Sequence, residues 1–278
     1  MIDLDHLRTW IGREEEGSEL LTEAITNRFN ATFDREGPAH NGAVAPVLIH
    51  LCLAPPAAPT TALGQDGHPA RGGFLPPVPL PRRMWAGGAF VFHDEIRVGD
   101  IVTRHSTIRD VTVKEGRSGM LCFVTVDHRI ESGGRLAVEE RHDIVYRGDD
   151  PAGGAPGTAP PPAARGGDRV VVDPSAALLF RYSALTFNGH RIHYDNPYTR
   201  NEEGYPGLIV HGPMQATMLV QFAEKLRGTS PARFDFRSLS PLFDTASFTL
   251  NAEPDGDGLR LWTARDDGPV AMEARATW

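Results

Sequence analysis

The sequence predicts an α+β fold in which two halves each place helices against an antiparallel sheet. The chain has 278 residues, and its stretch GDDPAGGAPGTAPPPAARGGD at residues 148–168 is too rich in glycine, proline and alanine to build a core. We therefore expect a linker there, between halves at residues 1–147 and 169–278. Both halves repeat one order, with helical segments first and a run of strands after them.

The first half supplies two helical patterns and four strand patterns. SELLTEAITNRFN (18–30) has apolar residues at helical spacing, and VAPVLIHLCLA (44–54) is short and apolar enough for one buried helix. The stretch from Ala54 to Pro81 is rich in proline and predicts a long loop docked on the surface. Segments rich in Val, Ile, Thr and Phe, separated by turn sequences, predict strands at 90–98, 100–113, 119–130 and 136–147.

The second half follows the same order. SAALLFRYSALT (175–186) predicts a helix, and PMQATMLVQFAEKLRG (213–228) predicts a longer one whose apolar residues share a face that we interpret as core. Pro213 suits its first turn and Gly228 its C-terminal end. Strand patterns follow at 233–240, 246–253, 259–265 and 270–278.

Composition excludes several classes of function. A net charge of −8 disfavours a nucleic-acid surface, and no apolar run approaches the ~20 residues that a membrane helix needs. The N-terminal MIDLDHLRTWIGREEE lacks the pattern of a secretory signal, so we expect a cytoplasmic protein. Cys52 and Cys122 lie in apolar runs without CxxC spacing, which favours buried thiols over a disulfide or a zinc site.

The segment TFNGHRIHYD at residues 186–195 is the strongest candidate site. It places two histidines three residues apart, with an amide before them and a carboxylate after them. His190, His193 and Asp195 are acceptable metal ligands, but no further ligand cluster stands out in the sequence, and we expect no metal. His193 is the natural acid–base group, because a neutral imidazole accepts a proton near pH 7.

A second block, PGLIVHGPMQ (206–215), follows this segment and opens the long helix. Together the two blocks resemble the MaoC-like enoyl-thioester hydratases, whose signature is D-x4-H followed by PG-x-V-H-G-x-L. Asn188-x4-His193 stands for the first motif. The second motif appears as Pro206, Gly207, Ile209, Val210, His211 and Gly212.

The longer stretches FRYSALTFNGHRIHYD and RGGFLPPVPLPRRMWAGG resemble one subgroup, which includes hydroxyacyl-thioester dehydratase type 2 and the mesaconyl- and itaconyl-CoA hydratases. The resemblance implies a double hot-dog fold, in which each half wraps an antiparallel sheet around a central helix. It also implies a catalytic second half, and a first half that has lost the catalytic pair and covers the substrate tunnel.

The implied reaction is the reversible hydration of an enoyl-CoA, which in reverse is the dehydration of a 3-hydroxyacyl thioester. It needs a base for the water, an acid for the α-carbon and a donor for the enolate oxygen. We expect His193 to serve as acid and base, Asn188 to hold the water and the N–H of Gly212 to bind the oxygen at the helix start. No cofactor is implied, since the CoA or acyl-carrier-protein thioester is the substrate.

Asn188 departs from the family pattern, because its amide cannot take a proton where the family has Asp. Asp195 could orient the imidazole of His193 or take the missing carboxylate role. Both readings require His193 and Asp195 to project to the same side of an extended segment.

Six further residues are candidate substrate contacts. The arginines of PRRMWAGG either belong to a solvated basic turn with one anchoring aromatic or bind a substrate carboxylate or a CoA phosphate. The histidines either brace the turn and the helix or touch the substrate. The six are Arg82, Arg83, Trp85, His190, Arg191 and His211.

Two rival functions use the same sequence features. Hot-dog proteins include thioesterases, and Asn188 in place of Asp also suits a non-catalytic acyl-CoA binding protein. We expect a short dicarboxylic substrate such as mesaconyl-CoA or itaconyl-CoA, no nucleic-acid or membrane partner, and a homodimer.

Overall fold

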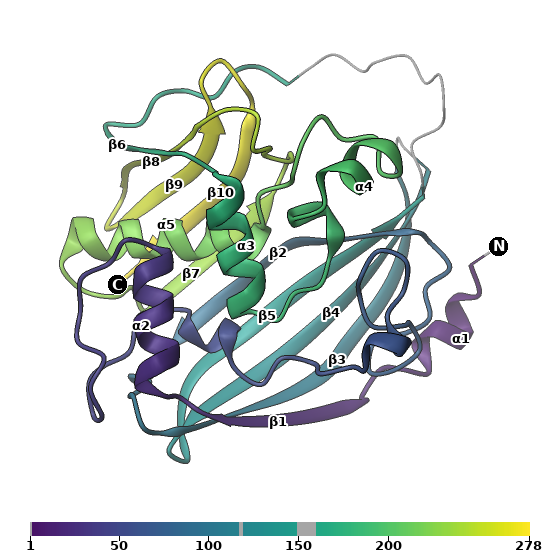
Figure 1. Ribbon diagram of the computed structural model, residues 1–278, viewed down its shortest axis with the longest axis horizontal. Helices are drawn as coiled ribbons and strands as arrows, with labels where there is room; N and C mark the ends of the chain where they lie inside the picture. Colours follow the sequence, from purple (N-terminus) through teal and green to yellow (C-terminus); the bar gives the residue numbers. More distant parts are fainter. Residues whose placement is uncertain (1, 117–118, 149–159) are drawn as a thin grey trace.

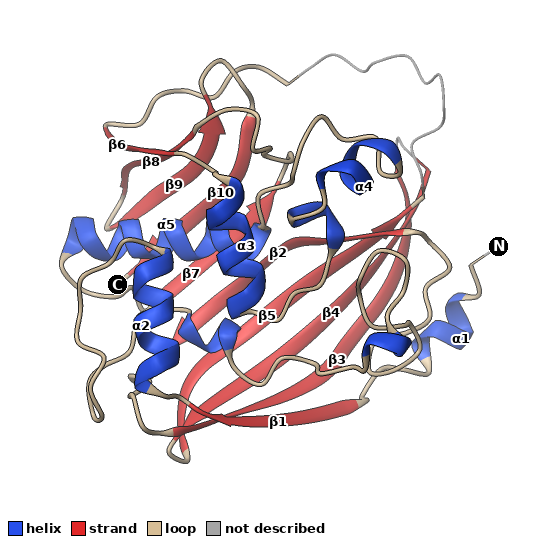
Figure 2. Ribbon diagram, in the orientation of Figure 1, coloured by secondary structure: helices blue, strands red, loops and turns tan. Residues whose placement is uncertain are grey.

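The computed structural model describes residues 2–116, 119–148 and 160–278, and their strands form one antiparallel sheet (Figures 1 and 2). The strand order is β1-β3-β4-β5-β2-β7-β10-β9-β8-β6. The strands are β1 (Glu14–Leu20), β2 (Arg82–Phe92), β3 (Ile101–Gly116), β4 (Gly119–Ser132), β5 (Arg135–Arg147), β6 (Asp168–Val172), β7 (Arg233–Ser238), β8 (Phe248–Asp255), β9 (Gly258–Arg265) and β10 (Val270–Thr277).

The described helices are short, except for the one that packs against β7 to β10 (Figure 1). That helix, α5, ends at Gly228, whose φ of 76° stops it in the left-handed conformation that glycine adopts readily. The helices are α1 (Leu4–Arg8), α2 (Glu23–Thr32), α3 (Ala176–Leu185), α4 (Asn196–Asn201) and α5 (Gly212–Arg227), with 3₁₀ turns η1 (Ile49–Cys52), η2 (Thr60–Ala62) and η3 (Arg191–His193).

The two halves meet where β2 pairs with β7, so the sheet runs without a break from one half to the other. Backbones approach closely at this junction: a Cβ added to Gly87 would lie 2.7 Å from the Phe236 carbonyl oxygen, and one at Gly88 would collide with the Arg141 carbonyl. Glycine is therefore required at both positions. Phe90 stacks on Phe236 with ring centroids 5.6 Å apart, which gives both halves a shared core.

The predicted order of elements needs one correction. Two strands are absent from the predicted order: β1, which lies between α1 and α2, and β6, which precedes α3. β1, EEEGSEL, has seven residues that alternate between exposed and partly buried. Its acidic composition is unusual for a strand, and it lies at the edge of the sheet, paired with β3. The helix that the sequence predicts from residue 18 begins at Glu23, because the residues before it belong to β1 and to the turn after it.

The first half also differs from the prediction of a buried helix at residues 44–54. Only the 3₁₀ turn η1 forms there, after Leu48 with a φ of 62°. Pro46 interrupts the segment and the proline-rich residues after it cannot continue a helix. The 3₁₀ turn η1 contributes Ile49 and Cys52 to the larger core, and the long segment that leads to β2 contributes Val78 to a second core.

PRRMWAGG is part of β2 and not a solvated turn, since β2 begins at Arg82 and lies at the centre of the sheet. The long helix and the helix at α3 match their predicted positions. None of the helices within the described ranges is long and apolar enough to cross a membrane.

The linker predicted at residues 148–168 falls largely on residues 149–159, which lie outside the described residues. Its last part runs along the second half. There the Ala163 N–H donates to the Gly268 carbonyl at 2.8 Å, and the Trp262 indole N–H donates to the Ala164 carbonyl at 3.0 Å. The division of the chain at this stretch stays a prediction.

Substitution of Phe90 tests whether the two halves share a core. Phe90 is fully buried between the two halves, so Phe90→Ala leaves a cavity and is expected to lower the free energy of unfolding by about 3–5 kcal/mol. Met84 lies on the same strand but is 43% exposed, so Met84→Ala should cost less than about 1 kcal/mol. Urea denaturation measures both, and equal losses would contradict the shared core.

Candidate active site

The TFNGHRIHYD segment reverses direction at the end of α3 and runs back toward the start of α5. Phe187 has a φ of 49°, which is uncommon for a residue other than glycine, and the Asn188 N–H donates to the Ser183 carbonyl at 2.8 Å. After η3 the chain pairs with the second motif, because the Ile209 N–H donates to the Ile192 carbonyl at 2.9 Å. The two sequence blocks are therefore neighbours in space.

His193 is buried at this junction, with 7% of its surface exposed. Its Nδ1 lies 2.7 Å from the Ile209 carbonyl oxygen, which can only accept, so Nδ1 carries the proton and Nε2 has a free lone pair. Burial lowers the pKa of His193 to about 4, although the hydrogen bond to Ile209 acts in the opposite direction. A neutral ring with a free Nε2 is the form that a general base needs near pH 7.

His211 lies against His193, with ring centroids 3.6 Å apart and planes 17° from parallel. Its Nε2 is 2.8 Å from the Ser183 hydroxyl of α3. Burial, together with the neighbouring histidines, lowers the pKa of His211. Because only 1% of His211 is exposed, the geometry favours a bracing role between α3 and the start of α5 over contact with substrate.

His190 continues the row of rings on the other side of His193. Its centroid is 5.4 Å from that of His193 and 4.0 Å from that of His68, which comes from the proline-rich segment of the first half. The Nδ1 of His68 is 2.9 Å from Asp66 Oδ2, and its backbone N–H donates to Asp66 Oδ1. His190 therefore lies between the predicted catalytic histidine and an Asp–His pair.

The first half is fastened to the TFNGHRIHYD segment at this point. The Arg191 N–H donates to the Asp66 carbonyl at 2.9 Å, and the Arg191 guanidinium donates to the Gln65 carbonyl at 3.1 Å. Gly67, with a φ of 87°, touches Gly189 so closely that a Cβ added to Gly67 would collide with the Gly189 carbonyl oxygen. Two glycines are therefore needed for this contact.

Asn188 and Asp195 make local contacts. The Asn188 Oδ1 accepts the His190 N–H at 3.0 Å, which leaves its Nδ2 without a hydrogen bond to a described residue. Asp195 caps α4 by accepting the Tyr198 N–H at 3.1 Å, and its other oxygen pairs with Arg191 at 2.8 Å. The prediction that Asp195 orients His193 needs correction, because the segment is not extended and the Ile209 carbonyl occupies Nδ1.

Arg191 is equally engaged. Besides its pair with Asp195, its guanidinium lies 4.0 Å from the centroid of the Tyr198 ring. These contacts hold α4 and the first half against η3. The geometry favours a positioning role for Arg191 over direct contact with substrate.

Gly212 begins α5 next to His211, so its N–H lies at the positive end of a 16-residue helix, where no intrahelical acceptor is available. Trp85 of β2 packs over it, since a Cβ added to Gly212 would be 3.4 Å from the Trp85 ring. Trp85 also lies 5.0 Å from His142 between ring centroids. The predicted oxyanion donor is thus covered by an aromatic ring from the first half.

Arg82 and Arg83 are adjacent on β2 but have different neighbours. The Arg82 guanidinium donates to the Tyr205 hydroxyl and the Glu203 carbonyl, both at 3.2 Å, and so fixes the loop after α4. Arg83 instead lines a cavity of about 260 Å³ together with Asp66, His68, Arg71 and Tyr198. Of the two predicted arginines, only Arg83 therefore reaches the space beside the histidines.

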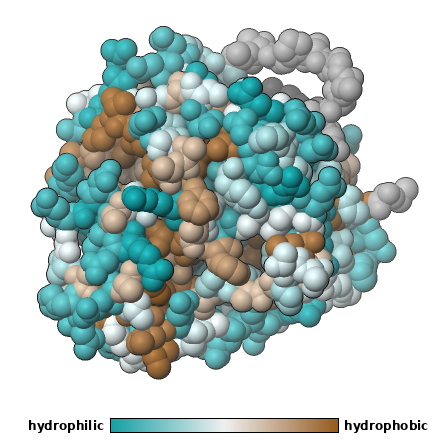
Figure 3. Space-filling model, viewed as in Figure 1, coloured by the Kyte–Doolittle hydropathy of each residue, from teal (hydrophilic) through white to brown (hydrophobic). Residues whose placement is uncertain are grey.

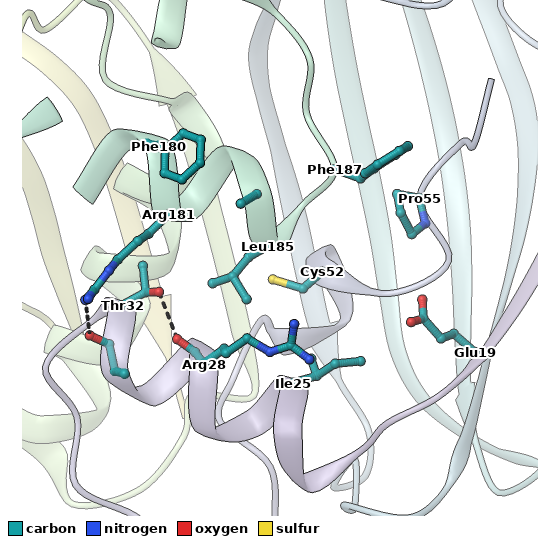
Figure 4. Close-up of a pocket in the computed structure, with 12 residues that line it drawn as sticks. Glu19, Ile25, Arg28, Thr32, Cys52, Pro55, Phe180, Arg181, Leu185 and Phe187 are labelled. Carbon is teal, nitrogen blue, oxygen red and sulfur yellow. Dashed lines mark hydrogen bonds between the residues drawn. The ribbon is translucent and has the colours of Figure 1, made fainter. Parts of the chain in front are cut away.

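A larger cavity of about 550 Å³ lies on the other side of the segment, between α2, α3 and η1. Figure 4 shows Phe180 and Phe187 along one side of it and Ile25 and Arg28 of α2 along the other. On the face drawn in Figure 3, apolar surface gathers near α3, where Phe180 and Phe187 are 62% and 64% exposed. The TFNGHRIHYD segment thus separates an apolar cavity from a basic one.

Two groups of side chains place atoms that could bind a metal ion within 4.8 Å of one another. The first group is Asp66, His68 and His190, and the second is His128, Glu140 and His142. In the first, both carboxylate oxygens of Asp66 already bind His68, so we interpret it as a hydrogen-bonded pair. In the second, His50 lies 3.6 Å from Glu140, and this contact helps to lower the pKa of Glu140 to about 2 against the effect of burial. Asp195 joins neither group.

Comparisons with known proteins show the family of this chain. The family described as hydroxyacyl-thioester dehydratase type 2 matches residues 48–244. The mesaconyl-C(4)-CoA hydratase of Chloroflexus aurantiacus is 45% identical over 269 residues, which cover 95% of each chain. This chain belongs to the hydroxyacyl-thioester dehydratase type 2 family.

Solved structures support the fold of the family. A MaoC-like dehydratase from Phytophthora capsici has a TM-score of 0.68 at 13% identity and covers 99% of this chain and 98% of its own. A Mycobacterium tuberculosis protein described as having a double hotdog fold has a TM-score of 0.59 at 12% identity and covers 96% and 95%. The predicted α+β double hot-dog fold is confirmed, and the predicted hydro-lyase class agrees with the family and with the named relative.

Sequence reasoning missed several residues that the structure places beside the predicted site. Asp66 and His68 stood in a proline-rich loop, and the only local signal was their D-x-H spacing, which permits a hydrogen bond between the side chains. Ser183 and the Ile209 carbonyl orient histidines but carry no motif of their own.

The buried rings make stability depend on pH. The folded His193 has a pKa of about 4 and an unfolded histidine titrates near 6.5, so between these values the unfolded chain binds a proton that the folded chain does not. The free energy of unfolding must therefore fall as pH drops, by about 2 kcal/mol from pH 6.5 to pH 5 for this ring alone.

Urea denaturation from pH 7.5 to pH 4.5 measures this dependence. His193→Gln should reduce the slope by up to one proton, whereas His105→Gln, which replaces a ring with 42% of its side chain exposed, should leave it unchanged. An unchanged slope in His193→Gln would contradict a neutral, buried His193.

Proposed function

We propose that the protein catalyses the reversible hydration of a short enoyl-CoA that carries a second carboxylate, such as mesaconyl-CoA. The observation that carries this proposal is the neutral His193, fixed by the Ile209 carbonyl beside the start of α5. Membership of the family supports the reaction type. The name of the 45% identical relative, a mesaconyl-C(4)-CoA hydratase, supports the substrate class.

The reaction begins with a water molecule held between the Nε2 of His193 and the amide Nδ2 of Asn188. His193 takes a proton as the water oxygen bonds to the β-carbon, and the electrons of the double bond move toward the thioester carbonyl. The Gly212 N–H stabilises the enolate oxygen, assisted by the dipole of α5 and by the exclusion of water under Trp85. Proton transfer to the α-carbon completes the hydration.

The basic cavity is the place for the second carboxylate. Arg83 lines it, and its neighbour among the described residues is the phenol of Tyr146 and not a carboxylate in an ion pair. Arg71 also lines it but is occupied, because it donates to the carbonyls of Val78 and Pro81 at 2.7 and 2.6 Å. A substrate carboxylate would give Arg83 a charged partner for a bidentate pair, beside its contact with Tyr146.

The larger, apolar cavity suits the pantetheine arm of the thioester. Arg28 and Arg181 lie among its lining residues, where their guanidinium groups can meet the phosphates of CoA (Figure 4). The thioester would then cross the TFNGHRIHYD segment, with its reactive carbons beside His193 and its acyl carboxylate toward Arg83.

The remaining expectations belong to this proposal. The reaction needs no cofactor beyond the thioester itself, and CoA is preferred to a carrier protein because the relative acts on a CoA thioester by name. We also propose a cytoplasmic homodimer, for which light scattering and cell fractionation are the direct measurements.

His193→Gln is expected to slow hydration by roughly 10²–10⁴-fold, because glutamine cannot exchange a proton with the substrate. Loss of the conjugated enoyl absorbance measures hydration, and free thiol release measures thioester hydrolysis in the same sample. Wild-type protein that releases thiol faster than it consumes the enoyl group would instead be a thioesterase. Tight binding of the thioester without either reaction would indicate a binding protein.

Arg83→Met is expected to remove the preference for a dicarboxylic substrate. A bidentate pair between arginine and carboxylate contributes about 1–3 kcal/mol, so kcat/KM for mesaconyl-CoA should fall roughly 5- to 150-fold relative to crotonyl-CoA. Arg82→Met, which changes the adjacent arginine that binds Tyr205 and Glu203, should leave the ratio unchanged. A ratio that is the same in all three proteins would refute the role of Arg83 in substrate choice.

A further inference from the structure

The proposed reaction moves two protons, one from water and one to the α-carbon, and His193 alone has no carboxylate beside it. Asn188 cannot take a proton, and Asp195 is held by Arg191 and the N-terminus of α4. Within the described ranges, the carboxylate that reaches the row of histidines is Asp66, which comes from the first half.

Asp66 and His68 form an oriented pair. The aspartate accepts from the Nδ1–H of His68 at 2.9 Å, so the ring presents Nε2 as its reactive atom, and Nε2 has no hydrogen bond to a described residue. Burial alone would raise the pKa of Asp66, but its hydrogen bond with His68 keeps that pKa below the ordinary value. An anionic aspartate fixes the tautomer of the ring and stabilises the imidazolium when it forms.

The pair is held in place by backbone contacts. The Asp66 carbonyl accepts the Arg191 N–H, and Gly67 meets Gly189 without room for a side chain on either. His68 therefore has a fixed position one ring away from His193, with His190 between them and the basic cavity beside it. A substrate carboxylate that reaches Arg83 enters a cavity that His68 also lines.

We propose that His68, oriented by Asp66, is a second acid–base residue that returns the proton to the α-carbon in hydration and removes it in dehydration. This inference rests on the proposed hydratase function. In hydration, His193 takes a proton from water as the carbon–oxygen bond forms at the β-carbon. The enolate electron pair then bonds the α-carbon to the proton of the His68 imidazolium, and solvent carries one proton from His193 back to His68.

Substrate binding favours the protonated form of His68. Burial lowers the pKa of His68, and the charges of Arg83 and Arg71 lower it further, whereas the bond to Asp66 raises it. His190 and Tyr198 are the other titratable groups next to the pair. A substrate carboxylate that neutralises Arg83 removes part of the repulsion, so a dicarboxylic thioester should activate its own proton donor.

The test compares variants with the thioester that the wild type hydrates fastest. His68→Gln keeps the approximate shape but cannot transfer a proton, and kcat should fall at least about 100-fold while the Kd for the thioester changes less than threefold. Asp66→Asn should lower kcat and move a limb of its pH profile, which a purely structural residue would not do. His105→Gln, on an exposed ring, is the matched control.

Gly67→Ala is a second test, because it changes neither the Asp66 nor the His68 side chain. Its Cβ collides with the Gly189 carbonyl and displaces the pair, so a loss of kcat similar to that of His68→Gln is expected. The inference is overturned if His68→Gln keeps more than a third of wild-type kcat, or loses thioester binding as much as turnover. If the wild type and His193→Gln behave as proposed while His68→Gln is normal, the hydratase assignment stands and only this inference fails.

Discussion

The pairing of β2 with β7 is the contact on which the rest of the molecule depends. It joins the two halves through backbone hydrogen bonds at a place where Gly87 and Gly88 leave no space for side chains. The same strand contains Trp85, which packs over Gly212, and Arg83, which lines the basic cavity. One glycine-lined junction therefore sets the position of the first half relative to the start of α5.

The two halves contribute differently to the site. The second half supplies the buried histidines and the helix start, and its hydrogen bonds fix each ring in one orientation. In the described part of the first half, residues 44–54 form only the 3₁₀ turn η1, and the segment before β2 binds the TFNGHRIHYD segment through the Asp66 carbonyl. The candidate site therefore depends on a difference between the two parts of the chain.

The sequence predicted the parts of the molecule that rest on local pattern. The periodicity and end signals of α5 are strong. The two sequence blocks that contain Asn188, His193 and Gly212 resemble known hydratases, and the structure brings these blocks together, whereas their catalytic role stays a prediction. The acidic strand β1 escaped prediction because its stability comes from pairing with β3 and not from its own composition. The sequence did not predict the importance of Asp66 and His68. Their proposed role depends on the contact of His68 with His190, which lies more than a hundred residues away in the chain and leaves no local pattern.

The contact between Gly67 and Gly189 has a consequence for comparing this chain with others. Each glycine touches the backbone of the other, so a side chain at either position cannot be compensated by trimming its partner, which has nothing left to remove. In a related chain with a larger residue at one of these positions, the loop that contains His68 must lie elsewhere. The ring of His68 would then no longer contact that of His190. The two glycines together thus mark which relatives can build this form of the site.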